Sequence, residues 1–198
     1  MRNPITILIT VSAALFLVFF PTDIFAQNIA QLHEFNQTRL VFNQRGMLIL
    51  GAWAIGNMIW GGIGASRSLG VKKGFHQMNL YWNTVNLAIA AFGYYQAIND
   101  SPDIDFLATI VAQHGIEKIL LFNGALDIAY MTGGLFMLER GRRKDDERLL
   151  GFGKSVILQG AFLMVFDAIL YGFHVSNAKE LPELMKNLNL VLTGIFLP

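Results

Sequence analysis

The chain has 198 residues, enough for one domain, and its composition separates it from ordinary soluble proteins. Hydrophobic residues make up 54% and charged residues 15%, whereas soluble domains carry roughly 25% charged residues. The net charge of +1 provides no overall attraction to nucleic acid, so no nucleic-acid partner is expected. The absence of cysteine excludes disulfides, thiolate metal sites and cysteine nucleophiles. The composition therefore predicts a protein that lies in a lipid bilayer.

Residues 1–26 have the pattern of a secretory signal peptide. Arg2 precedes an apolar run over residues 5–20, and the small residue Ala26 stands before Gln27. Cleavage is predicted after Ala26, although Ile24 occupies a position where a small residue is preferred. The alternative is an uncleaved signal anchor, which would add a fifth membrane helix.

The mature chain, residues 27–198, is predicted to form one all-α domain, an integral membrane four-helix bundle. Four apolar stretches each approach the ~20 residues needed to cross a bilayer, and they cover residues 46–65, 77–98, 116–138 and 153–175. Because backbone groups in hydrocarbon must find partners within their own segment, each stretch is expected to be a helix. An amphipathic helix over residues 28–45 is expected to lie at the surface and lead into the first span.

The connections between the spans differ in charge. The first and third are basic, and contain Arg67, Lys72 and Lys73, and Arg140, Arg142, Arg143, Lys144 and Arg148, respectively. The second contains Asp100, Asp103 and Asp105. Because short basic loops remain in the cytoplasm, the pattern predicts a multi-pass protein of the bacterial inner membrane with both mature termini outside.

Two further outer amphipathic segments are expected. Ser101 and Pro102 predict a helix start, with serine as the cap and proline at the first helical position, so residues 103–114 should lead into the third span. The tail over residues 181–198 is too short and too polar to cross a membrane, and it is predicted to form an interfacial helix.

The two halves of the chain resemble each other, which predicts two repeated helical hairpins. Gly51 can be set against Gly124 and Gly61 against Gly134, and the same register pairs Gln44-Arg45 with Glu117-Lys118, Ile55 with Ile128 and Met58 with Met131. Gly74-Phe75 and Gly151-Phe152 open the second helix of each half. Two spans per repeat imply an axis along the membrane normal. The alternative is that these residue types are simply common in membrane helices.

Polar residues recur at helical spacing in every span and predict a buried polar core. The candidate core residues are Asp127, Asp167, Asn57, Asn83, Asn86, Asn123, Tyr130 and Gln159. A rise of about 1.5 Å per residue places Asn57, Asn86 and Asp127 in one layer. Both amides are therefore expected to donate hydrogen bonds to Asp127.

Asp127 and Asp167 are the most informative members of this set. A carboxylate at the centre of a membrane helix costs about 2.5–3.5 kcal/mol on insertion scales, so such residues are functional candidates by default. They would hold a proton, a cation or a cationic ligand. The alternative is that a protonated Asp and several Asn side chains only tie helices together.

No other catalytic or metal pattern is found. The chain lacks a serine or cysteine nucleophile constellation, and the spacing of His33, His76, His114 and His174 does not suggest a metal or haem site. Neither a metal nor a cofactor is predicted.

The run Phe75-His76-Gln77-Met78-Asn79, followed by Trp82-Asn83 and Asn86, stands beside Gly51-Ala52-Trp53 with Asn57. Together these motifs resemble a family of small bacterial four-helix membrane proteins classed as a domain of unknown function. The resemblance covers most of the mature chain and implies the fold, and it transfers no activity.

Three functions remain open. The leading one is a small transporter, a proton-linked component or a subunit of a membrane assembly, in contact with the lipid bilayer and with a second copy or another membrane protein as partner. The second is a membrane-embedded enzyme acting on a lipid or quinone-like substrate, with Asp127 or Asp167 as acid or base. The third is a purely structural membrane partner.

Overall fold

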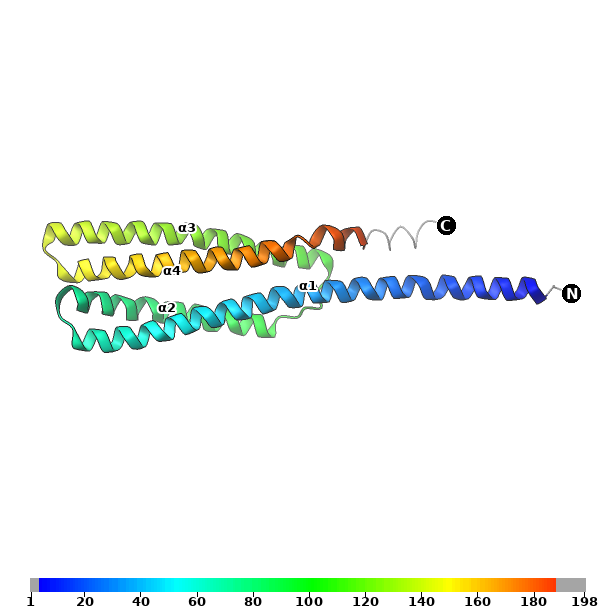
Figure 1. The fold of residues 1–198 in the computed structure, drawn as a ribbon, viewed down its shortest axis with the longest axis horizontal. Helices are drawn as coiled ribbons and strands as arrows, with labels where there is room; N and C mark the ends of the chain where they lie inside the picture. The colour runs from blue at the N-terminus through cyan, green and yellow to red at the C-terminus, as the bar shows by residue number, and fades with distance from the viewer. Residues whose placement is uncertain (1–3, 188–198) are drawn as a thin grey trace.

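The structure, a computed structural model, describes residues 4–187, with side chains from residue 26 onward. The described residues form four helices and no strand: α1 (Pro4–Arg67), α2 (Gly70–Asn99), α3 (Phe106–Lys144) and α4 (Glu147–Ala178). Successive helices run in opposite directions and lie along one long axis (Figure 1). The predicted all-α four-helix architecture is confirmed.

The first helix is longer than the sequence pattern predicts. Residues 28–45, expected to form a separate surface helix, and the span at 46–65 belong to one uninterrupted α1. No proline interrupts this stretch, so no backbone hydrogen bond is lost within it. The described backbone continues past Ala26, and the signal peptide over residues 1–26 stays a prediction because residues 1–3 and the side chains up to residue 25 lie outside the described part.

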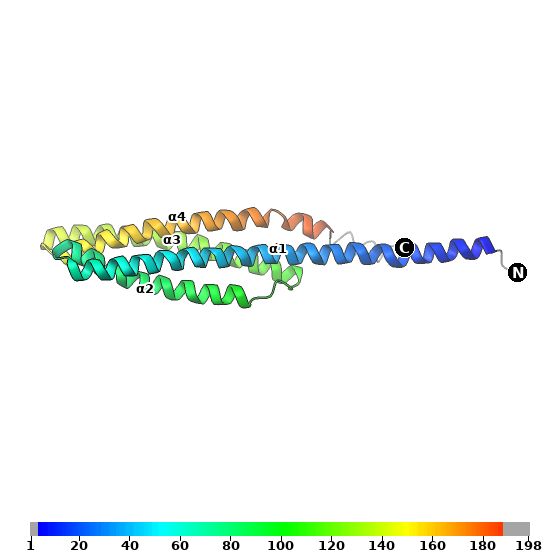
Figure 2. The same ribbon diagram turned by 60° about the horizontal axis from the view of Figure 1, so that its bottom comes forward.

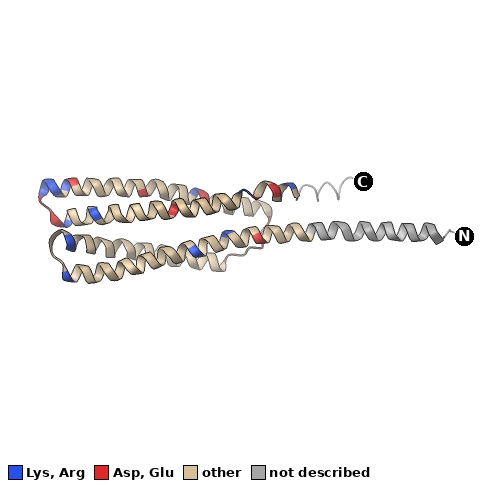
Figure 3. Ribbon diagram, viewed as in Figure 1, with Lys and Arg blue, Asp and Glu red and all other residues tan. Residues whose placement is uncertain are grey.

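The helices form two hairpins, α1–α2 and α3–α4, whose tight turns lie at the same end of the bundle (Figures 1 and 2). The turn residues are Ser68 and Leu69 in the first hairpin and Asp145 and Asp146 in the second. Lysine and arginine residues are concentrated at this end (Figure 3). The connection between the hairpins, residues 100–105, lies at the opposite end and contributes three aspartates there.

Glycines bring the helix backbones close together within each hairpin. A Cβ atom on Gly61 would lie 2.8 Å from the backbone oxygen of His76, and one on Gly134 would lie 2.9 Å from the backbone oxygen of Gly153. Such close approach permits tight van der Waals packing, which drives helix association where lipid removes the hydrophobic contribution.

The hairpins contact each other differently in the two halves of the bundle. Near the tight turns α2 packs on α4, where a Cβ atom on Gly74 would lie 2.8 Å from the backbone oxygen of Arg148. Toward the other end α1 packs on α4 instead, and the Trp53 and Phe162 rings stack with centroids 3.7 Å apart. α2 and α3 make little direct contact. The bundle is therefore closed on its α1–α4 side and separated on its α2–α3 side.

Three helical segments are long and apolar enough to cross a membrane: Ala26–Arg67, Phe106–Lys144 and Glu147–Asn187. α2 falls outside this set, and it carries the polar residues Asn79, Asn83 and Asn86. These asparagines are buried, whereas Val85, Ile89 and Phe92 on the same helix are exposed to the surroundings. The exposed surface of every helix is thus rich in large apolar side chains.

The predicted start of the third helix is wrong. Residues 100–105 are not helical, and the cap is Asp105, whose side chain accepts a hydrogen bond of 2.8 Å from the Ala108 backbone N–H. Ser101 instead accepts a bond of 3.0 Å from the Asp103 N–H, a local turn that competes with helix initiation. Both residue types are good caps, and the sequence pattern alone did not distinguish them.

The last described residues, 181–187, pack against α1 and α3. Residues 181–187 are helical, and Leu181 and Leu184 pack on Phe35 of α1 with Phe106 and Ile110 of α3 beside them. The described part of the expected interfacial helix therefore has its own apolar cluster. Residues 188–198 lie outside the described part.

Candidate functional site

Asn79 is the centre of a buried amide network that joins three helices. Its Nδ2 donates to Asn57 Oδ1 of α1 over 3.0 Å, and its Oδ1 accepts from Gln159 Nε2 of α4 and from Asn83 Nδ2. Gln159 Oε1 accepts from Trp53 Nε1 over 2.9 Å. Asn79, Asn83 and Gln159 are completely buried. In the described network each of these amides has a hydrogen-bond partner, as burial in an apolar medium requires.

The network differs from the expected layers. Asn57 is expected to lie beside Asn86 and Asp127, but it bonds to Asn79, which also bonds to Gln159. Asn79 lies on the same polar stripe as Asn83 and Asn86 but was absent from the candidate core. Its three- and four-residue spacing from neighbouring polar residues was the signal that could have identified it.

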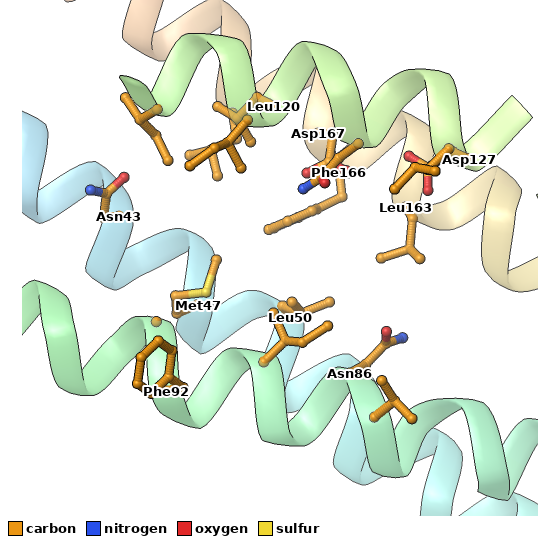
Figure 4. Close-up of a pocket in the computed structure, with 18 of the residues that line it drawn as sticks. Asn43, Met47, Leu50, Asn86, Phe92, Leu120, Asp127, Leu163, Phe166 and Asp167 are labelled. Atoms are coloured by element: carbon orange, nitrogen blue, oxygen red, sulfur yellow. The ribbon is translucent and has the colours of Figure 1, made fainter. Parts of the chain in front are cut away.

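A cavity of about 630 Å³ lies between the hairpins on the side where α2 and α3 separate (Figure 4). All four helices line it, with Met47 and Leu50 of α1 and Leu163, Phe166 and Leu170 of α4 among the apolar residues. The candidate core residues that line it are Asn86, Asn123, Asp127, Tyr130 and Asp167. The volume falls within the ~300–1,000 Å³ that small-molecule sites occupy. We call this cavity the groove.

Asp127 of α3 and Asp167 of α4 form a carboxyl pair on one wall of the groove (Figure 4). Both side chains are more than nine-tenths buried, and both line the same cavity. Two negative charges so placed in an apolar site would repel each other, which favours a proton on one of the two carboxyl groups. No amide or hydroxyl of the described residues donates to Asp127 Oδ2.

The expected donors to Asp127 are engaged elsewhere. Asn57 Nδ2 donates to the Trp53 backbone oxygen over 2.8 Å, and Asn86 Nδ2 donates to Asn83 Oδ1 over 3.4 Å. Asn86 lies across the groove from Asp127 in Figure 4. Axial depth placed these residues in one layer, but α1 hardly contacts α3, so the side chains point to different neighbours.

The other two candidate residues lie at the edge of the groove. Asn123 is half-buried, and Tyr130 is 36% exposed. The rings of Tyr130 and Trp82 meet edge to face, with centroids 4.9 Å apart. This contact between α3 and α2 bounds the groove toward the tight-turn end.

A second buried polar cluster, unforeseen from the sequence, lies toward the opposite end. Gln113 Nε2 donates to the backbone oxygen of His174 over 2.8 Å and to Glu117 Oε1 over 2.9 Å. The His174 ring is fully buried, and neither of its nitrogens has a partner among the described residues. Within residues 26–187, no group of three His, Cys, Asp or Glu side chains is arranged to hold a metal ion.

The charged residues of the groove are all acidic. Asp100, Asp127 and Asp167 line it, and no lysine, arginine or histidine does so among the described residues. An anionic headgroup would meet only like charge there, whereas a positive charge or a proton would be attracted.

Comparison with curated proteins and with solved structures returns no significant match. A family model described as "Family of unknown function (DUF6992)" matches residues 49–168, which include the amide network and both residues of the carboxyl pair. This match confirms the resemblance to an uncharacterised family inferred from the sequence motifs. The chain belongs to the DUF6992 family of unknown function.

Proposed function

We propose that all four helices cross the inner membrane of a bacterium, with the tight turns in the cytoplasm and both mature termini outside. The basic residues at the tight-turn end support this orientation (Figure 3). α2 is included because its asparagines face the bundle and its exposed residues are apolar. A helix with that distribution is compatible with lipid on its outer face.

The two hairpins are repeats in this proposal, and reciprocal contacts support the relation. A Cβ atom on Gly74 would meet the Arg148 backbone, and one on Gly151 would meet the Val71 backbone. The register that pairs Gly74 with Gly151 also pairs Val71 with Arg148. The two contacts therefore join equivalent positions, with the roles of the hairpins exchanged. Exchange of partners in this manner is the property of a two-fold interface.

The function that the geometry supports best is a proton-linked membrane component that binds a ligand in the groove. The observation that carries it is the buried carboxyl pair, because two acidic side chains line one open cavity with no basic residue beside them among the described residues. A purely structural core would be closed and would satisfy its polar groups, as the amide network does. The pair instead leaves Asp127 Oδ2 without a donor next to the groove.

A second candidate is a membrane enzyme that acts on a lipid-soluble substrate, and the lateral position of the groove favours it. A substrate could enter between α2 and α3 from the lipid and meet Asp127 or Asp167 as an acid or base. The outcome that separates it from the first function is chemical conversion of a bound lipid or quinone-like molecule, which a transporter or proton-linked component does not produce.

Infrared spectroscopy of the purified full-length protein tests the proton. The carbonyl band of a protonated carboxyl group in a nonpolar site is expected in the wild type and should disappear as the pH rises. Asp127→Asn and Asp167→Asn should each abolish or shift this band. Asp103→Asn is the matched control, because Asp103 is exposed and pairs with His33 over 2.6 Å at the surface. A wild-type band identical to that of both core variants would disprove the shared proton.

Cysteine labelling in intact cells tests the orientation. The natural chain has no cysteine, so one introduced thiol reports one site. Ser101→Cys should react with a membrane-impermeant maleimide added outside, and Ser68→Cys should react only after the membrane is opened. The reverse pattern would refute the orientation and leave the carboxyl pair unaffected.

A further inference from the structure

We infer that the groove binds an organic cation with an apolar body, whose positive charge replaces the proton held between Asp127 and Asp167. This inference rests on the proton-linked function proposed above and adds the class of ligand.

The charge of the groove selects the sign of the ligand. Its three charged lining residues are carboxylic acids, and no lysine, arginine or histidine of the described residues lines it. Two buried carboxyl groups with one proton carry one negative charge between them, and loss of that proton leaves two. A cation offsets this charge, whereas a phosphate or carboxylate headgroup would add to it.

The lining also selects an apolar ligand body. Most of the groove wall is aliphatic or aromatic, and the aromatic residues are Trp82, Phe92, Tyr130 and Phe166. Aromatic faces attract organic cations, most strongly where the site is desolvated. An inorganic ion such as Ca²⁺ takes about six to eight oxygen ligands, and the carboxyl pair with its apolar surroundings does not supply them.

The proposed repeat explains why the groove is empty of side chains. On the closed side of the bundle, Trp53 of α1 stacks on Phe162 of α4. The repeat registers place Leu126 of α3 and Val85 of α2 at the corresponding positions, and both smaller residues line the groove. The groove therefore occupies the position at which, on the closed side, two aromatic rings fill the space between the hairpins. Smaller side chains at the equivalent positions leave it open.

The same correspondence shows that the carboxyl pair has no counterpart in the first hairpin. Ala54 and Ala90, both buried, stand in the first hairpin where Asp127 and Asp167 stand in the second. Packing at this level is thus achieved by alanine in one hairpin, so the carboxyl groups are not needed to hold such a helix pair together. The carboxyl groups are therefore available to bind a cationic ligand or a proton.

The groove is reached from the side. α2 and α3 flank it and make little contact, and Val85, Ile89 and Ile119 at its edges are exposed apolar residues. A cation with an apolar body dissolved at the membrane surface would enter between these helices. Binding forms no covalent bond. The cation enters, the proton on the carboxyl pair leaves to water, and the charge of the site is unchanged.

The test uses two probes of the same shape and opposite charge, tetraphenylphosphonium and tetraphenylborate, with benzyltrimethylammonium as a smaller cation. Each is added to the purified full-length protein in a neutral detergent and weak buffer, and released protons are measured with a pH dye. Tetraphenylphosphonium or benzyltrimethylammonium should release up to about one proton per chain in a saturable manner, with an affinity that rises up to about tenfold per pH unit while the pair is protonated. Asp127→Asn should abolish the release, and Asp103→Asn should leave it unchanged.

Each other outcome overturns the inference. Proton release by sodium ions at the same concentration would identify an inorganic cation site, and saturable binding of tetraphenylborate would exclude selection by charge. Failure of both organic cations to release protons, with the infrared band of the pair present, would reject the ligand class and retain the proposed proton. Absence of that band would reject the proposed function together with the inference.

Discussion

At the level where a Cβ atom on Gly51 would touch Ala90, the α1–α2 hairpin buries alanine on both helices. The α3–α4 hairpin has Asp127 and Asp167 at the positions that the proposed repeat makes equivalent. One pair of helices has buried methyl groups at this level, and the other has buried carboxyl groups. The difference shows that two helices can pack in this way without ionisable side chains. The carboxyl pair is therefore the part of the core with a function beyond packing in this proposal.

The hairpins also differ in their neutral polar groups. Asn57, Asn79 and Asn83 of the first hairpin form hydrogen bonds with one another, and Gln159 attaches them to the second. At the positions that the proposed repeat makes equivalent, the second hairpin has Tyr130, Val156 and Gly160. The first hairpin therefore contributes most of the satisfied polar core, and the second contributes the ionisable groups beside the groove.

The largest expected effect is on the contact between the hairpins. Gly151→Ala and Gly74→Ala place a methyl group against backbone atoms of the other hairpin, and each should destabilise the protein by about 1–3 kcal/mol. Gly62→Ala and Gly124→Ala are controls, because a Cβ atom there meets nothing within 4 Å. Thermal unfolding in detergent measures the difference. Equal stability of all four variants would contradict the reciprocal packing.

Next in size is the energetic coupling within the carboxyl pair. Asp127→Ala leaves Asp167 buried without its partner, which should cost about 1–3 kcal/mol. The double variant Asp127→Ala/Asp167→Ala makes this level of the second hairpin resemble the first, and most of the lost stability should return. A double-mutant cycle measured by denaturation should give an interaction energy of about 0.5–3 kcal/mol. Simple additivity of the two single variants would show that the carboxyl groups do not interact.

Filling the groove should remove ligand binding without removing the proton. Leu126→Trp introduces the side chain that the first hairpin has at the equivalent position, Trp53. Affinity for tetraphenylphosphonium should fall by about tenfold or more, equivalent to about 1.4 kcal/mol, while the infrared band of the carboxyl pair remains. Phe122→Trp is the control because Phe122 is exposed on the outer surface of the same helix. Unchanged affinity in Leu126→Trp would place the ligand elsewhere.

The smallest expected effect concerns the amide network. Gln159→Leu leaves the Trp53 indole N–H without its acceptor and removes one of the two donors to Asn79 Oδ1. Interhelical hydrogen bonds in membranes contribute about 0.6 kcal/mol on average and at most about 1.7 kcal/mol, so the loss in unfolding free energy should lie in that range. Thr132→Val is the control, since Thr132 is exposed and bonds only within its own helix. A loss of unfolding free energy as large as that of Asp127→Ala would show that the amide network and the carboxyl pair contribute equally to stability.

The position of the helices was predictable because it depends on the length and apolar character of local segments. The spans predicted at 77–98 and 153–175 lie inside α2 and α4, and polar stripes identified residues such as Asn83 and Gln159 that are fully buried. Helix starts were less predictable. Ser101 and Asp105 are both good caps, and the choice between them depends on which side chain reaches a free N–H in the folded loop.

The sequence by itself determined an all-helical, lipid-compatible chain, the two hairpins and the asymmetry of charge between their ends, because these follow from composition and spacing along one segment. Tertiary structure alone decided which polar residues meet. Asn57 accepts a hydrogen bond from Asn79, which in turn accepts one from Gln159, whereas Asp127 lines the groove with Asp167. The physical reason is that axial depth is a property of one helix, whereas a hydrogen bond also requires the rotation and crossing of two helices. Glycine contacts between backbones set that crossing, and they bring α2 onto α4 at one end while leaving the groove at the other.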